Sequence, residues 1–415
     1  MILTTEKNNF EIHSSCRSRE AIIFSTLIGL FPLLSVYKSP IPAVDAGTFL
    51  LILFLFLTLK FRLEYSELGL LITYVFALMV LTLLDGELLV SKVLYISRNL
   101  KFLISLCIVF QLGYRTLFFK EEFAFKIIRA IIYINTLFIL LQTIMYRFGI
   151  IINNPLYIFA TNDAYIQNTL EYSDALYLYR PSGIFFEPSH YSEYAVVYLI
   201  YSSFKTKNAR DVIVTLLGIC CTGSGIGLYV SFVTLLLILT VYSTKNVHNF
   251  IISLFGVCAL NVFFQFILQD IFFQKSLFRI FTDNTEGGGN AFLGRVSSYS
   301  FFFDRNIIDL VFGSGFGNVP SDIYLNGLSY LGYGIGIVGF LIFLCTLVKC
   351  FFYTDNWRKV LLVLFFTIVS VAQVFTAGFI VFFFCIIKSN TSSPKYTYNQ
   401  RDVKTQHLMN PSLEK

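Results

Sequence analysis

The feature that most constrains this chain is the recurrence of apolar runs near 20 residues long from one end to the other. Hydrophobic residues make up 56% of its 415 residues, and charged residues only 13%. A soluble protein of this length would need far more charge on its surface. The sequence therefore predicts an all-α polytopic integral membrane protein. Its net charge of +6 does not indicate a nucleic-acid partner, because the basic residues are spread over short loops.

About twelve transmembrane helices are expected. The predicted spans are 21–37, 44–59, 66–84, 100–118, 125–146, 183–204, 211–222, 226–243, 250–269, 327–348, 359–374 and 376–388. Two long polar intervals, 147–182 and 270–326, interrupt them. The chain thus divides into a polar N-terminal segment (1–20), a transmembrane domain (21–388) and a polar tail (389–415).

The distribution of Lys and Arg gives the orientation, because cytoplasmic loops carry an excess of them. With the N-terminus in the cytoplasm, 21 of these residues fall inside and 10 outside, although the outside loops are longer. Both long loops are therefore predicted to face the periplasm or the cell exterior, and segments 1–20 and 389–415 the cytoplasm. The eight Cys residues suggest neither a disulfide framework nor a zinc site.

The segment 180–194, RPSGIFFEPSHYSEY, crowds charge at the mouth of an expected helix. Charge is expensive there, which favours a function over chance. Pro188 suits the first position of the helix, with Glu187 flanking it. Residues three and four apart share a helix face, so Glu187, His190 and Tyr194 should lie together.

Two further residues of this segment matter. Glu193 should lie about half a turn away from that face and deeper. Arg180 is the strongest functional candidate. The alternative is an interfacial anchor in which Arg180 snorkels to the surface and Glu187 offsets the helix dipole.

Glycine-rich stretches follow in order along the chain. TGSGIG at 222–227 separates two apolar runs, and FGSGFGN at 312–318 leads into GYGIGIVG at 332–339. Such glycines allow close approach of backbones or tight turns, and the bland interpretation is helix packing. The first stretch lacks the lysine and the strand that a phosphate-binding loop requires.

Arginines that are predicted to lie outside the membrane form a second group of candidate functional residues. Arg295 and Arg305 lie in the second long loop, and Arg98 precedes the fourth span. Guanidinium groups bind phosphate oxygens in bidentate fashion and stay charged. Two arginines from separate loops could therefore clamp one pyrophosphate. Asp322, in the same loop, offers a carboxylate.

The order of these motifs resembles the Wzy-type polysaccharide polymerases of the O-antigen polymerase and ligase superfamily. The resemblance rests on RPSGIFFEPSHYSEY, TGSGIGL, FLGR at 292–295, and FGSGFGN running into GYGIGIVG. The resemblance is specific over about residues 180–340, where motifs and their order match. Over the first 146 residues it is limited to the hydropathy pattern. Gly225 stands where many members carry arginine.

The resemblance implies a metal-independent glycosyltransferase, without cofactors, at the outer face of the bacterial cytoplasmic (inner) membrane. Its substrates would be oligosaccharide repeat units linked to undecaprenyl pyrophosphate, and its surroundings membrane lipid. The family depends on arginines in both large outer loops, and the matching positions are Arg180 and Arg295. The resemblance leaves a chain-length regulator protein open as a partner.

Residue chemistry suggests the remaining roles. Glu187 and Asp322 are the expected proton acceptors, and His190 is the next candidate for that role. Arg305, Arg98, Glu193 and Tyr194 join His190 as expected substrate-binding residues.

Two alternatives stay open. One is a ligase of the same superfamily, although 270–326 lacks the histidine that ligases usually carry ahead of the glycine-rich helix. The other is a flippase or transporter for lipid-linked sugar, against which the scarcity of charge within the spans argues.

Overall fold

The computed structural model describes residues 3–35, 37–40, 45–58, 67–85, 91–114, 119–159, 181–243, 301, 303–319, 325–371 and 377–388. Within these ranges the chain is helical, and its only β pairing is an isolated bridge between Lys38 and Asp45. Arg180, Arg295 and Asp322, with most of the two long loops and the tail, lie outside the described residues.

The helices vary widely in length. They are α1 (Leu3–Leu34), α2 (Ala46–Thr58), α3 (Glu67–Asp85), α4 (Lys92–Tyr114), α5 (Glu121–Arg147), α7 (Pro188–Tyr201), α8 (Ala209–Cys221), α9 (Gly225–Ser243), α13 (Ile307–Phe312), α14 (Gly327–Tyr353), α15 (Asn356–Val371) and α16 (Ala377–Lys388). A 3₁₀ turn covers Pro155–Phe159, and a π turn, η2, covers Ser202–Thr206.

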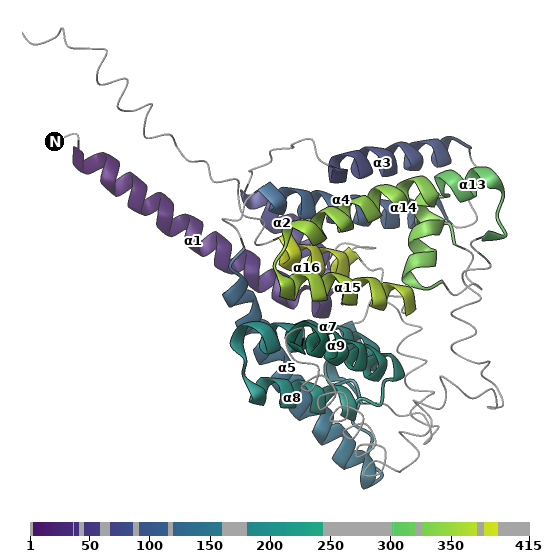
Figure 1. The fold of residues 1–415 in the computed structure, drawn as a ribbon. Helices are drawn as coiled ribbons and strands as arrows, with labels where there is room; N and C mark the ends of the chain where they lie inside the picture. The colour runs from purple at the N-terminus through teal and green to yellow at the C-terminus, as the bar shows by residue number, and fades with distance from the viewer. Residues whose placement is uncertain are drawn as a thin grey trace, which may run out of the picture.

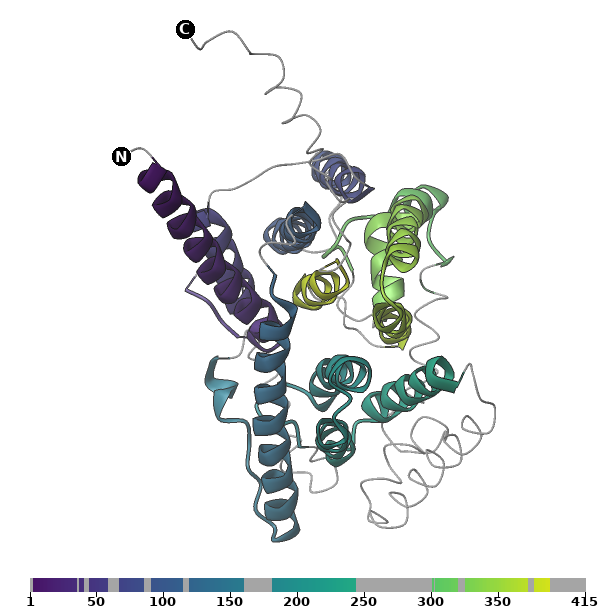
Figure 2. The same cartoon turned by 60° about the vertical axis from the view of Figure 1, so that its left-hand side comes forward.

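The helices form two groups joined by a third (Figure 1). One group contains α5, α7, α8 and α9, and the other contains α3, α4, α13 and α14. Between them lie α1, α15 and α16, as the view in Figure 2 also shows. α15 contacts both groups, α1 packs against α5 of the first group, and α16 packs against α4 of the second. The buried apolar core runs through all three groups, so the described helices form one bundle.

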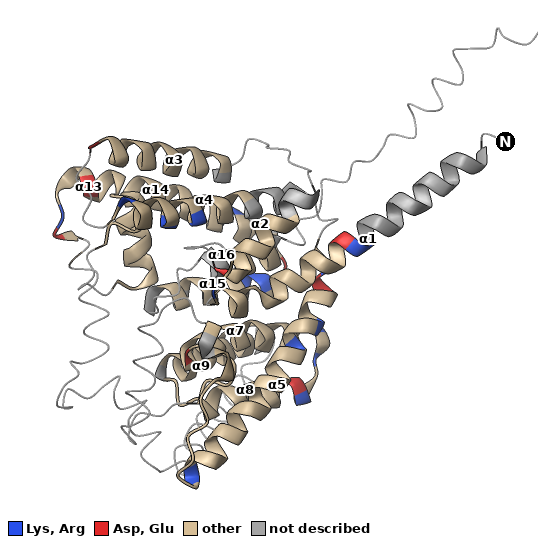
Figure 3. Cartoon of the chain, turned by 180° about the vertical axis from the view of Figure 1, so that it is seen from behind, with Lys and Arg blue, Asp and Glu red and all other residues tan. Residues whose placement is uncertain are grey.

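Among the described residues, two helices are long and apolar enough to cross a membrane: α5 and Gly327–Phe352 of α14. Large apolar side chains also cover the outside of the bundle, among them Leu84, Leu137 and Phe148 at 77%, 70% and 75% exposure. Figure 3 shows that most of the ribbon carries no charge, whereas α4 bears positive segments along its length.

Several helices begin at positions that differ from the expected spans. The largest difference is at α1, which begins at Leu3, not at 21, so that most of the polar segment 1–20 is helical. α7 begins at Pro188, not at 183, because 181–187 is held in a non-helical course by side chains of other elements. α4 begins at Lys92, not at 100, so that Arg98 lies within the helix and Lys101 lies well past its first turn. A hydropathy average over a sequence window excludes charged residues from a predicted span. It takes no account of the residues from other helices that contact those charges in the fold.

Candidate functional site

The segment 181–187, here called the approach loop, lies against the middle of α5. Asn135 of α5 accepts a hydrogen bond from the Ile184 N–H (2.7 Å), and Gln142 accepts one from the Gly183 N–H (2.8 Å). Asn135 lies twelve residues before Arg147, the last residue of α5, or about 18 Å along the helix axis. The approach loop therefore leads into α7 beside the middle of α5, far from the C-terminal end of that helix.

Further side chains satisfy the backbone of the approach loop. Asn154 donates to the carbonyls of Ile184 (3.0 Å) and Phe185 (3.2 Å), and the Tyr37 hydroxyl donates to Ile184 (2.7 Å). A non-helical backbone among apolar helices requires such partners, because each buried amide otherwise loses its hydrogen bond to water. Gly183 has φ of +66°, and a Cβ there would overlap the Asn135 amide.

The first turn of α7 has the predicted arrangement. Glu187 is the N-cap residue with extended backbone, and Pro188 follows as the first helical residue. The Ser189 hydroxyl donates to Glu187 Oε2 (3.0 Å). Glu187 and His190 are both half-buried, so each side chain is partly accessible at the start of α7.

Deeper residues of α7 belong to the interior. Glu193 is 1% exposed, and Tyr194 is fully buried with its hydroxyl donating to the Gly29 carbonyl of α1 (2.7 Å). Tyr194 therefore contributes to the packing of α7 on α1. Its predicted role with Glu193 in substrate binding stays a prediction.

The first glycine-rich stretch lies beside α7. Gly223 turns the chain between α8 and α9 with φ of +60°. A Cβ at Gly227 would overlap the Ser192 hydroxyl, so the start of α9 touches α7 one turn after its N-terminus. Two motifs that are separated in sequence are thus neighbours in the fold.

The second glycine-rich stretch forms a loop at 313–318, called the glycine loop, between α13 and α14. Asn99 of α4 holds it from both sides, accepting from Phe316 N–H (3.0 Å) and donating to Phe316 carbonyl (2.6 Å). α14 breaks its helical conformation where this loop meets it, at Gly336 (φ 63°, ψ −175°). A Cβ at Gly313 would overlap the backbone there.

Two predicted arginines flank the glycine loop. Arg305 donates to the Ser314 hydroxyl and to the Tyr333 carbonyl, and its guanidinium carbon lies 3.8 Å from the Tyr333 ring centroid. Arg98 contacts the other side, where a Cβ on Gly317 would lie 3.0 Å from its Cδ. The structure thus brings Arg98 and Arg305 to one loop, and Arg305 also fixes that loop's shape.

Sequence reasoning missed Asp45 and Lys101. Asp45 lies just before α2, and its Oδ2 is 3.9 Å from Lys101 Nζ of α4. The residue after it, Ala46, donates its N–H to the carbonyl of Tyr37, the residue whose hydroxyl holds the approach loop. The start of α2 therefore connects the approach loop to α4 and, through α4, to the glycine loop. An Asp followed by a helix and a Thr three residues later was the available signal for Asp45.

No protein-family model matches the chain, and no curated protein matches it significantly. In the described part of the chain, no three His, Cys, Asp or Glu side chains gather as they would to hold a metal ion. Chemically, the described residues offer cations on α4 and at Arg305, just before α13, and a carboxylate and an imidazole at the start of α7.

Proposed function

We propose that this protein is a membrane glycosyltransferase of the Wzy type. It joins oligosaccharide repeat units linked to undecaprenyl pyrophosphate into a surface polysaccharide, such as O-antigen or capsule. The observation that carries the proposal is the convergence of the motifs. The approach loop and the glycine loop both break regular helix within the bundle, and the start of α2 with α4 links them.

The membrane setting has its own support. Irregular backbone at membrane depth is tolerated where protein side chains satisfy it, as Asn135, Gln142 and Asn154 do for the approach loop. The exposed leucines and phenylalanines suit contact with lipid. We place the chain in the bacterial inner membrane as a multi-pass protein, with a cytoplasmic N-terminus and the approach loop opening outward.

The reaction is a glycosyl transfer. A hydroxyl of the acceptor sugar attacks the anomeric carbon of the donor, the bond from that carbon to the pyrophosphate oxygen breaks, and lipid pyrophosphate leaves. Arg180 and Arg295 stabilise the charge that develops on the leaving group. Glu187 or Asp322 accepts the proton of the attacking hydroxyl. The half-buried position of Glu187 at the start of α7 is compatible with this role.

Transport of a lipid-linked sugar is the second candidate function, and one observation favours it. Transporters often bind anionic groups at the N-termini of helices that begin or break at mid-depth. α7 begins beside the middle of α5, and α14 is interrupted at Gly336. Purified protein that lengthens lipid-linked repeat units in detergent would exclude transport as the main activity.

The test uses cells that make the polysaccharide, with Arg180→Ala and Arg295→Ala in place of the native protein. We expect both variants to leave a single repeat unit on a gel where the native protein gives a ladder. Arg147→Ala, at the last residue of α5, is the matched control and should keep the ladder. Full ladders from well-expressed variants of both motif arginines would refute the proposed role.

A further inference from the structure

α4 carries two cations inside its helical length. Arg98 and Lys101 follow the first helical residue, Lys92, by six and nine residues, which places Lys101 about 14 Å along the axis. Ionisable groups at such a depth in a membrane helix are costly and mark binding sites or pathways. Lys101 is partly accessible, with 29% of its side chain exposed.

In the described part of the chain, Lys101 pairs with the carboxylate of Asp45, which is already engaged elsewhere. Asp45 caps α2: its Oδ1 accepts from the Thr48 N–H (2.8 Å) and its Oδ2 from the Thr48 hydroxyl (2.9 Å). Lys101 Nζ lies 3.9 Å from Oδ2, beyond the range of a good hydrogen bond. Asp45 thus partly neutralises Lys101 without consuming its N–H donors.

Arg98 adds a second positive charge on the same side of α4. It lies three residues before Lys101, so the two side chains are neighbours on the helix surface, and their charges repel. Its alkyl chain packs against Gly317 of the glycine loop, and its guanidinium lies beside the Tyr330 hydroxyl. Asp45 pairs with Lys101, and Arg98 adds a second positive charge, so these three side chains together carry a net positive charge.

We propose that Lys101 and Arg98 bind the pyrophosphate of the lipid-linked donor, with Asp45 as the partner of Lys101 in the empty site. Lysine supplies a point charge with three donors, and arginine a planar fork for phosphate oxygens. The packing of Arg98 on Gly317 holds its guanidinium beside the glycine loop, near the Tyr330 hydroxyl. The proposal rests on the proposed function for the identity of the anion, whereas the charge arrangement comes from the structure alone.

The test measures binding of two probes to purified full-length protein in detergent: farnesyl pyrophosphate and inorganic pyrophosphate, each against sulfate at equal ionic strength. Lys101→Gln should weaken binding of both pyrophosphates about tenfold or more, since it removes charged hydrogen bonds. Lys101→Arg should retain most of the affinity. Lys92→Gln, an exposed lysine at the start of the same helix, should leave it unchanged.

Asp45→Asn gives the decisive arm, because Asn also caps helices well. If Lys101 serves an anion, removing the competing carboxylate should tighten binding severalfold. If the pair is merely structural, Asp45→Asn and Lys101→Gln should act in the same direction. Unchanged binding in Lys101→Gln, or weaker binding in Asp45→Asn, would overturn the proposal, and the Asp45 arm decides alone if Lys101→Gln fails to fold.

The readout separates this proposal from the function above. A protein that binds pyrophosphate through Lys101 but makes ladders without Arg180 and Arg295 would keep the site and lose the polymerase mechanism. Tighter retention of farnesyl pyrophosphate than of the inorganic ion would indicate that the prenyl chain adds contacts. Binding of neither probe to the native protein would overturn the site itself.

Discussion

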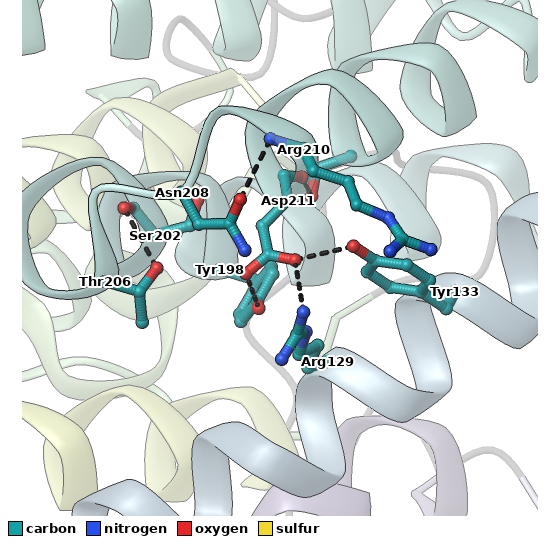
Figure 4. Close-up of polar contacts among 9 residues, drawn as sticks. Arg129, Tyr133, Tyr198, Ser202, Thr206, Asn208, Arg210 and Asp211 are labelled. Atoms are coloured by element: carbon teal, nitrogen blue, oxygen red, sulfur yellow. Dashed lines mark hydrogen bonds and ion pairs between the residues drawn. The ribbon is translucent and has the colours of Figure 1, made fainter.

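Asp45 and Asp211 are both buried carboxylates at the start of a helix, each near a cation on a neighbouring helix, yet their surroundings differ. Asp211 of α8 accepts from the Tyr133 (2.6 Å) and Tyr198 (2.9 Å) hydroxyls and pairs with Arg129 (3.0 Å), as Figure 4 shows. Asp45 accepts mainly from its own helix and holds Lys101 only at 3.9 Å.

This difference indicates that the Asp211–Arg129 ion pair is structural, whereas Lys101 can exchange Asp45 for another anion. Around Asp211, three side chains from α5 and α7 converge on one carboxylate, and Arg129 and Arg210 both lie over the Tyr133 ring, at 5.5 and 5.7 Å. Every oxygen of Asp211 is therefore occupied from outside its helix, which joins α5, α7 and α8. Asp45 makes its close contacts within its own first turn, so its cation can serve another anion.

Asp211→Asn should have the largest effect on stability. It leaves Arg129 without its carboxylate and places an N–H₂ group against hydroxyl or guanidinium donors. Breaking a buried pair costs about 3–5 kcal/mol, and the partial exposure of Arg129 (47%) moves the expectation to the lower end, about 3 kcal/mol. Unfolding in detergent, followed by far-UV circular dichroism, measures it. Asp304→Asn, an exposed carboxylate, is the control, and equal midpoints for both would contradict a structural role.

Tyr198→Phe should cost less, about 1.5 kcal/mol, because it leaves Asp211 Oδ2 without its hydroxyl donor while Tyr133 and Arg129 remain. The same unfolding measurement applies. Combining Tyr198→Phe with Asp211→Asn should add little to Asp211→Asn alone, since both remove one interaction. Full additivity would show that the Tyr198 hydroxyl is not coupled to this carboxylate.

Arg210→Ala should cost about 0.5 kcal/mol, the value of an exposed cation over an aromatic ring. Its backbone N–H donates to the side-chain oxygen of Asn208, the N-cap of α8, and that hydrogen bond survives the substitution. A loss several times larger would mean that Arg210 also carries part of the charge balance around Asp211.

Asp45→Asn should have the smallest effect, within about 0.5 kcal/mol, because Asn and Asp are equivalent helix caps. The same substitution, Asp to Asn, should thus lower the free energy of unfolding several times more at Asp211 than at Asp45. A loss at Asp45 as large as that at Asp211 would show that Lys101 is held there as firmly as Arg129 is held by Asp211, and would remove the basis for an exchangeable site.

The start of α7 shows what residue patterns can predict. Proline at the first helical position and glutamate before it are local preferences, and the structure confirms both at Glu187 and Pro188. The depth at which α7 begins was not predictable, because it depends on Asn135 and Gln142 of α5, more than 40 residues earlier. Those two amides looked like ordinary polar residues within an apolar helix.

The cations of α4 show the opposite case. Charge made Arg98 look like a loop residue and Lys101 like the edge of a span. The structure places both well within α4, in contact with the glycine loop and the start of α2. Pairing at a distance in sequence leaves no periodic signal. Asp211 was missed for the same reason, since its three partners come from two other helices.

By itself, the sequence determined that the chain is helical and apolar, where several of its helices begin, and which segments carry unusual glycines and charges. These properties follow from local backbone preference and the cost of transferring each residue out of water, which act over a few residues. Only the tertiary structure decided which motifs meet, that Asp211 consumes its cation and that Asp45 leaves Lys101 available. Such outcomes depend on which donors lie within hydrogen-bond distance of each carboxylate. The packing of whole helices sets those distances.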